Sequence, residues 1–229
     1  MSRSPRVARV HVLAAMLLAA SFFTGGAEGA EAQEVPRYGA GWLGGGSFVT
    51  ELNPDANGAA LEPGFGGIVA VHVDRWLGDT RRIGLRYQGA YQRPQFDWSP
   101  GERRIHTASG DLSLMARVLD PADGHRLLPF LAAGLGGTWY DLGTGPETTF
   151  SPANALHDGS SQILLTGVIG AAVDIVTPWT WDRYPMRFRV EVADHITFDS
   201  PLHRVDDRDR YGAVHHFRFS IGAHTVFSY

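Results

Sequence analysis

The chain has 229 residues, no cysteine and a formal net charge of −4, and all its basic residues are arginines. The lack of cysteine excludes disulfides and a lipidated N-terminal cysteine, and the weakly acidic charge excludes a basic surface for nucleic acid. No run of 18 or more apolar residues is present, so membrane-spanning helices are also excluded.

The first 32 residues are expected to form a cleavable signal peptide of a bacterial envelope protein. Three arginines within the first nine residues precede an apolar segment at residues 12–23, and residues 30–32 (AEA) match the small-residue cleavage pattern. An uncleaved anchor is the alternative, but this apolar segment is too short to span a membrane. The mature domain is expected to cover residues 33–229, a length suited to one domain.

Apolar and polar residues then alternate with a period of two, which is typical of β-strands. In the last segment, Phe217, Phe219 and Ile221 lie in an apolar row, whereas Arg218 and His216 lie in the opposite, polar row with His224. The pattern predicts eight strands, at residues 37–52, 63–76, 82–92, 104–118, 127–141, 162–176, 184–198 and 211–229.

The connections between these segments alternate between long and short. Long segments rich in loop-forming residues follow the first, third, fifth and seventh strands, including residues 93–103. Short turns are predicted at residues 77–79, 120–124 and 177–182. This asymmetry is typical of an even-stranded outer-membrane barrel with both termini in the periplasm, long loops outside the cell and short turns inside.

The pattern therefore predicts an all-β fold, an eight-stranded antiparallel up-and-down transmembrane β-barrel. In such a barrel the apolar row faces lipid and the polar row faces the lumen. A secreted lipocalin-type binder is the alternative, but it would have an apolar lumen, whereas the inward row here is charged.

Particular segments resemble the small OmpA/OmpX-type family of outer-membrane β-barrel domains. They are residues 129–137 (PFLAAGLGG), 177–179 (TPW) and 189–195 (RVEVADH), together with the aromatic C-terminal residues Phe227 and Tyr229. The resemblance implies a barrel over the whole mature chain. It also implies that Phe227 and Tyr229 belong to the signal read by the barrel-assembly machinery.

Charged residues on the inward rows predict an ion-pair network that closes the lumen. An eight-stranded barrel is narrow enough for side chains to fill, and buried charges must be paired or hydrated. A narrow path for ions or solutes is the alternative. The predicted network consists of Arg86, Asp111, Arg117, Asp174, Arg187, Arg189, Glu191 and Arg218, and is centred on Arg189, Glu191 and Arg218. The same inward rows also carry Asp74, His72, His216 and His224.

The histidines do not predict a metal site within the strands. His215 and His216 are adjacent in a strand and point to opposite faces, so they cannot chelate one ion together. A weak divalent site could form in the loop that carries His203, Asp206, Asp207 and Asp209, but such a run is more often a solvated loop. No metal and no cofactor are expected.

Catalysis is not expected either. His195, Asp199 and Ser200 supply the residue types of an acyl-transfer site, so a lipid-modifying hydrolase is an alternative. However, His195 belongs to the inward row, away from the lipid, and the chain has no Gly-x-Ser-x-Gly motif.

The sequence therefore favours a monomeric protein of the bacterial outer membrane with a structural or surface-interaction role. Its expected partners are outer-membrane lipid and lipopolysaccharide, with the barrel-assembly machinery during biogenesis and no nucleic acid. A narrow channel for small solutes or hydrophobic compounds is the second interpretation.

Overall fold

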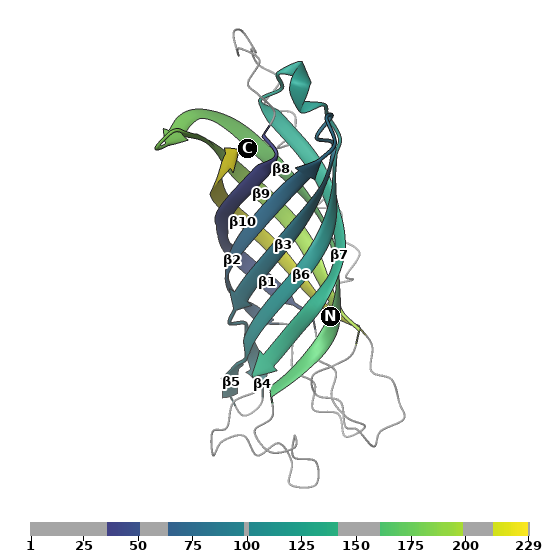
Figure 1. Ribbon diagram of the computed structural model, residues 1–229. Helices are drawn as coiled ribbons and strands as arrows, with labels where there is room; N and C mark the ends of the chain where they lie inside the picture. The colour runs from purple at the N-terminus through teal and green to yellow at the C-terminus, as the bar shows by residue number, and fades with distance from the viewer. Residues whose placement is uncertain (1–35, 51–63, 99–100, 142–160, 199–212, 229) are drawn as a thin grey trace, which may run out of the picture. The chain divides into compact units, whose positions relative to one another are not determined.

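The computed structural model describes residues 36–50, 64–98, 101–141, 161–198 and 213–228. These residues form an antiparallel sheet that closes on itself (Figure 1). The predicted signal peptide, Tyr229 and the loop with His203, Asp206, Asp207 and Asp209 lie outside the described residues. None of the described residues forms a helix long and apolar enough to cross a membrane.

Eight strands make the barrel wall, which confirms the predicted fold. Each strand pairs with the next along the chain, and β1 pairs with both β2 and β10, which closes the barrel. The strands are β1 (Tyr38–Val49), β2 (Gly64–Leu77), β3 (Ile83–Gln92), β6 (His106–Arg117), β7 (Leu127–Asp141), β8 (Ser161–Trp181), β9 (Tyr184–Thr197) and β10 (Val214–Phe227).

The turn end is the end of the barrel where β2 joins β3, β6 joins β7 and β8 joins β9; Tyr38 and Phe227 also lie there. The 3-10 helix η1 (Pro121–Asp123) forms the β6–β7 connection, as the predicted turn at residues 120–124 implies. The Asp120 carboxylate caps it by accepting a hydrogen bond from the Ala122 backbone N–H at 2.9 Å. The opposite end is the loop end.

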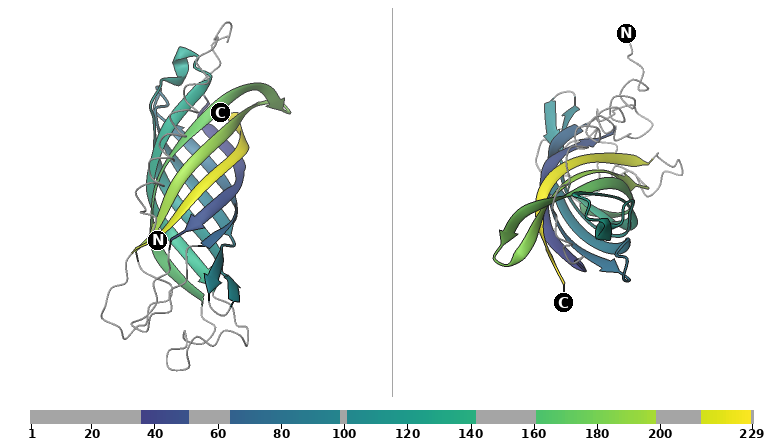
Figure 2. Two further views of the ribbon diagram at one scale, coloured as in Figure 1. Left: turned by 180° about the vertical axis from the view of Figure 1, so that it is seen from behind. Right: turned by 90° about the horizontal axis from the view of Figure 1, so that it is seen from above.

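Two predictions about connections were wrong. Residues 93–103 were predicted as a plain loop, but they carry most of a hairpin, β4 (Gln95–Trp98) and β5 (Gly101–Arg104), joined to β2 through one pair. Residues 177–182 were predicted as a turn, but β8 continues to Trp181. This extended β8–β9 hairpin projects outward from the wall at the turn end (Figure 2). Here backbone pairing continues past the proline that suggested the turn.

The alternation of burial matches the predicted faces. In β10 the side chain of Phe219 is 50% exposed, whereas that of Arg218 is 4% exposed; Phe217 and Ile221 are exposed and His216 is buried. The predicted orientation of this strand is therefore confirmed. The exterior of the other strands is also rich in exposed apolar residues, including Val71, Leu112, Leu135 and Ile169. The barrel is thus apolar outside and charged inside, as a lipid-facing wall requires.

Candidate functional site

The candidate site is the charged interior of the barrel. The inward positions of six strands bury four carboxylates and five guanidinium groups among the described residues. Because these strands alternate strictly, each of these side chains faces the lumen rather than the exterior. The buried charged residues are Asp74, Arg86, Asp111, Arg117, Asp174, Arg187, Arg189, Glu191 and Arg218.

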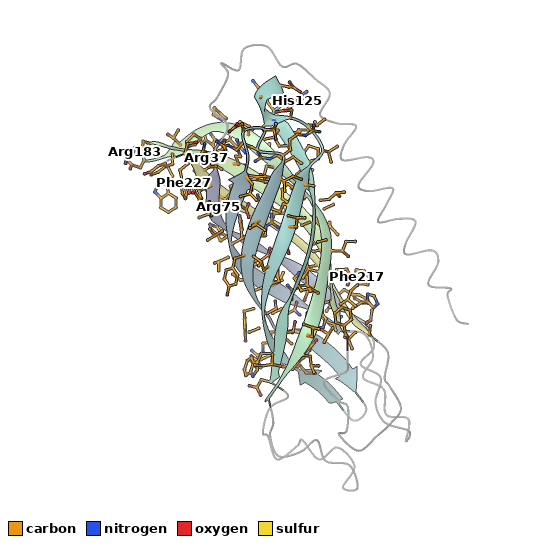
Figure 3. The ribbon with its side chains drawn as sticks, turned by 45° about the vertical axis from the view of Figure 1, so that its right-hand side comes forward. Arg37, Arg75, His125, Arg183, Phe217 and Phe227 are labelled. Carbon is orange, nitrogen blue, oxygen red and sulfur yellow. The ribbon has the colours of Figure 1, made fainter. Side chains whose placement is uncertain are left out.

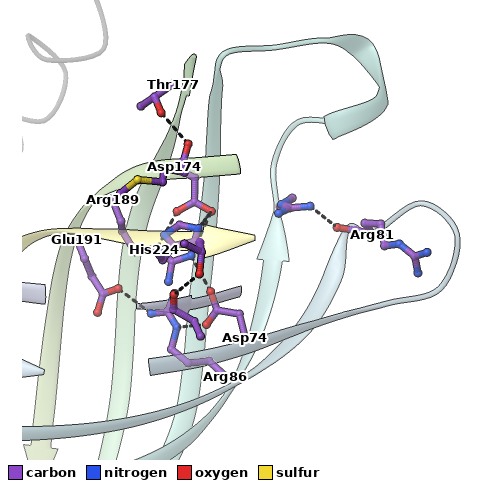
Figure 4. Close-up of polar contacts among 12 residues, drawn as sticks. Asp74, Arg81, Arg86, Asp174, Thr177, Arg189, Glu191 and His224 are labelled. Atoms are coloured by element: carbon purple, nitrogen blue, oxygen red, sulfur yellow. Dashed lines mark hydrogen bonds and ion pairs between the residues drawn. The ribbon is translucent and has the colours of Figure 1, made fainter. Parts of the chain in front are cut away.

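Five of these residues form a continuous ion-pair chain, Asp174–Arg189–Asp74–Arg86–Glu191 (Figure 4). Arg189 donates from Nε to Asp174 at 2.6 Å and from Nη2 to Asp74 at 2.7 Å. Arg86 donates from Nε to Asp74 at 3.0 Å and from Nη1 to Glu191 at 2.6 Å. The chain therefore alternates acids and bases, so every charge within it has an opposite neighbour.

The bond between Arg86 and Glu191 crosses the lumen. Arg86 lies on β3 and Glu191 on β9, and these strands are four positions apart in both directions around the closed sheet. Arg189 and Asp74 also join non-adjacent strands, β9 and β2. Opposite walls of the barrel are therefore in direct contact at this level.

An apolar plug contacts the ion-pair chain. It comprises Trp76, Met115, Phe130, Ala132 and Ala172. The guanidinium groups of Arg86 and Arg189 lie 5.0 and 4.8 Å from the centre of the Phe130 ring, within the range of cation–π attraction. Phe130 was not predicted to lie beside these charges, although its position in the row opposite Leu131 is an inward one.

Asp74 is buried on an inward row, as its parity predicted. It is a central member of the ion-pair chain, because it accepts from both Arg86 and Arg189. The parity of β2, which Asp74 shares with His72, predicted its inward position but not its two arginine partners.

Arg218 does not belong to the ion-pair chain, contrary to the prediction that it is one of its three centres. Its guanidinium bonds to His195 Nε2 at 3.1 Å and donates to Ser109 Oγ at 3.0 Å. Its position along β10 places it closer to the loop end than Glu191 of the ion-pair chain. The prediction missed this difference because parity fixes the face of a residue but not its height along the barrel.

Asp111, Arg117 and Arg187 are also inward but make no ion pair among the described residues. Asp111 accepts a hydrogen bond from Ser113 at 3.0 Å. Arg117 stacks over Trp76 at 3.6 Å and donates to the Arg81 carbonyl at 3.1 Å. The predicted set is thus brought into one interior, but only Arg86, Asp174, Arg189 and Glu191 of that set belong to the ion-pair chain.

A second polar cluster closes the interior nearer the loop end. His216 lies between Gln92 and Tyr140: its Nδ1 is 2.8 Å from Gln92 Nε2, and its Nε2 is 2.5 Å from the Tyr140 hydroxyl. The same hydroxyl is 2.9 Å from Thr197 Oγ1. This cluster joins four different strands, β3, β7, β9 and β10, and was not predicted.

Between the two polar layers lies a small cavity. It is lined in part by Arg86, Gln88, Asp111 and Glu191, and the space available to the centre of a water molecule is about 10 Å³. A volume of this size corresponds to about one water molecule. The interior is therefore closely packed around this cavity.

Of the three residue types considered for a hydrolase, only His195 lies among the described residues. His195 is buried in the lumen beside Arg218, away from the lipid-facing surface, and Asp199 and Ser200 lie outside the described residues. The part of the chain that the structure describes contains no group of three potential metal ligands. His215 points outward, as its parity requires, and its Nδ1 lies 2.7 Å from Asp194 Oδ2.

The aromatic C-terminal segment packs at the turn end. Phe227 stacks on Tyr38 with 5.7 Å between ring centres, and Tyr184 contacts its edge at 5.9 Å. Phe227 thereby joins the last strand to the first and to β9. Its role as an assembly signal, with Tyr229, stays a prediction.

No protein-family model matches the chain, and no curated protein matches it significantly. Among solved structures, the outer membrane protein OprG from Pseudomonas aeruginosa is similar, with a TM-score of 0.56 and 12% identity over 87% of this chain and 100% of OprG. Neisserial surface protein A gives 0.48 and 13% over 87% and 100%, and AlkL gives 0.47 and 14% over 90% and 96%. At this identity the likeness to OprG supports the fold alone, and membership of the OmpA/OmpX-type family stays a prediction.

Proposed function

We propose that this protein is a closed barrel of the bacterial outer membrane with a structural or surface-interaction role. The observation that carries this proposal is the bond of 2.6 Å between Arg86 and Glu191 on opposite walls, inside a barrel whose exterior is apolar. An apolar exterior requires lipid, and opposite walls in contact do not leave a pore.

The partners follow from the same surfaces. Lipid and lipopolysaccharide cover the apolar exterior, and the barrel-assembly machinery inserts the chain through its C-terminal aromatic segment. The turn end then faces the periplasm and the loop end faces the cell exterior, where the long connections supply the surface for interaction. The protein acts as a monomer, because each of the eight wall strands already has two neighbours and the closed wall leaves no edge to pair.

The test is single-channel recording with the purified, folded full-length protein in planar bilayers. We expect no reproducible conductance, because the ion-pair chain and the apolar plug fill the lumen. Folding is checked independently by the heat-dependent mobility that intact barrels show in gels. Reproducible channel openings by folded protein would overturn the closed-barrel proposal and favour the narrow channel for small solutes or hydrophobic compounds.

A further inference from the structure

The β8–β9 hairpin departs from the barrel wall at a bulge. Val176 pairs with Arg187 and Thr180 pairs with Pro185, so Thr177, Pro178 and Trp179 all oppose the single residue Met186. Extra residues on one strand bend and twist a hairpin, and proline removes one ladder donor. The outward projection at the turn end therefore has a local cause (Figures 1 and 2).

The Thr177 side chain stabilises this bulge. Its hydroxyl donates a hydrogen bond to the Met186 carbonyl at 2.8 Å and accepts one from the Trp179 backbone N–H at 3.3 Å. The hydroxyl thereby connects the two strands at the point where their regular pairing is interrupted. The bend is thus an ordered feature of the hairpin.

The aromatic residues of the hairpin lie on the face that continues the lipid-facing wall. Trp179 contacts the ring edge of Phe188 at 5.5 Å, and Trp181 pairs directly with Tyr184. Tyr184 in turn contacts Phe227, which belongs to the exterior aromatic row at the turn end. Trp179 and Trp181 are nevertheless 56% and 70% exposed. They form an apolar surface without a cover in the described part of the chain.

The outward bend changes the direction in which this surface faces. A strand pair in the wall presents its outer face sideways, to the lipid tails. When the pair bends outward at the end of the barrel, the same face turns toward the plane of the membrane. The tryptophans are therefore directed at the level where lipid headgroups meet the tails, which is where tryptophan is enriched in membrane proteins.

Positive charge lies beside these aromatic side chains. Arg183, at the hairpin turn, lies 5.3 Å from the Tyr184 ring centre and donates to its hydroxyl at 3.3 Å. Arg37 and the exposed Arg75 lie at the same end of the barrel, near Phe227 (Figure 3). Guanidinium groups pair well with phosphate, so this combination fits a glycerophospholipid headgroup layer.

We propose that residues 177–185 form an interfacial anchor that lies on the periplasmic leaflet beside the barrel. Trp179 and Trp181 insert at the boundary between headgroups and tails, and Arg183 lies among the phosphates. This inference rests on the proposed function, because it requires the barrel to span the outer membrane with its turn end in the periplasm. The partner of this anchor is the lipid surface of the membrane.

Because the chain has no cysteine, single cysteines report one position each. The full-length Trp181→Cys and Thr180→Cys variants are labelled with an environment-sensitive fluorophore and reconstituted in vesicles of phosphatidylethanolamine and phosphatidylglycerol. These neighbours lie on opposite faces of the hairpin, so they form a matched pair. Leu112→Cys, on the lipid-facing wall, and Asp123→Cys, in the exposed η1 turn, are the controls. Trp179→Cys is a second probe of the same face if Trp181→Cys does not fold.

We expect lipid-attached nitroxide to quench the label at position 181 at least twofold more than the label at position 180, and iodide in water to show the opposite order. Equal iodide access at the two positions, with Leu112→Cys quenched from the lipid, would overturn the anchor and leave the membrane barrel intact. A Leu112→Cys label that lipid nitroxide does not quench would remove the membrane location, and the anchor with it. Efficient disulfide formation between copies of Trp181→Cys at a high lipid-to-protein ratio would also overturn the lipid proposal. It would show that a second copy of the chain covers this surface.

Discussion

Replacing Arg189 by methionine tests whether the ion-pair chain stabilises the barrel. Arg189 is fully buried and donates to Asp174 from Nε at 2.6 Å and from Nη2 at 3.1 Å, and to Asp74 at 2.7 Å. After the substitution Asp74 keeps Arg86, but Asp174 keeps only the His224 Nε2 at 3.7 Å. Breaking a buried pair and leaving one charge without its partner costs about 3–5 kcal/mol. We expect Arg189→Met to lower the free energy of unfolding by this amount.

Arg187→Met provides a matched control. Arg187 lies two residues away on the same strand and the same inward face, and it is buried but makes no ion pair among the described residues. Its loss strands no carboxylate, so we expect a neutral or stabilising effect. The measurement is the urea midpoint in detergent micelles, followed by tryptophan fluorescence and by gel mobility.

A second substitution separates lost charge pairing from lost volume. In the Arg189→Met background, Asp174→Asn removes the charge that the first substitution leaves unpaired. We expect it to restore a large part of the lost stability. Equal midpoints for Arg189→Met and Arg187→Met, or no recovery with Asp174→Asn, would refute the claim that paired charges stabilise this interior.

Further expectations concern other parts of the barrel. Glu191→Ala should lower the urea midpoint more than Glu51→Ala, a control at a position outside the described residues. Because Arg86 keeps Asp74 as a partner, the loss of unfolding free energy should fall at or below the lower end of about 3–5 kcal/mol. Equal midpoints for the two variants would count against the network. Deleting Tyr229 or replacing it by aspartate should reduce the amount of heat-modifiable protein in the outer-membrane fraction, whereas Tyr229→Phe should not; unchanged amounts would argue against an assembly signal. Gly222→Ala should prevent barrel formation, because the added Cβ would lie 1.9 Å from the Trp42 carbonyl oxygen. Gly89→Ala is the control and should fold, because the atoms nearest to its added Cβ lie 4.0 Å away. Gel mobility distinguishes folded from unfolded protein in both variants.

The period of two in the sequence was sufficient to predict the faces of the strands. Phe219 and Arg218 are neighbours with opposite environments, and their burial follows directly from their parity. The alternation of long and short connections was likewise sufficient to predict an even-stranded barrel. Both features depend on the order of residues along the chain, so a single sequence is enough to show them.

Contacts across the lumen could not be predicted in this way. Arg86 and Glu191 meet because the stagger of a closed sheet brings β3 and β9 to the same height, and parity does not specify stagger. The same limit misplaced Arg218, which lies on the correct face but pairs with His195 instead of a carboxylate. The bulge at Thr177 was missed because the threonine and proline there are also typical of a turn.

The way in which side chains share the space inside the barrel also argues that the lumen is closed. Long arginine side chains from β3 and β9 extend across the lumen. Inward glycines of β7 let that strand lie close to β6: a Cβ on Gly136 would lie 2.7 Å from the Asp111 Cβ, and a Cβ on Gly134 would lie 2.4 Å from the Ser113 Oγ. The wall there has no room for even a methyl group. A barrel built to conduct would leave space beside its charges, whereas here glycines let neighbouring strands approach closely around an ion-pair chain that spans the interior.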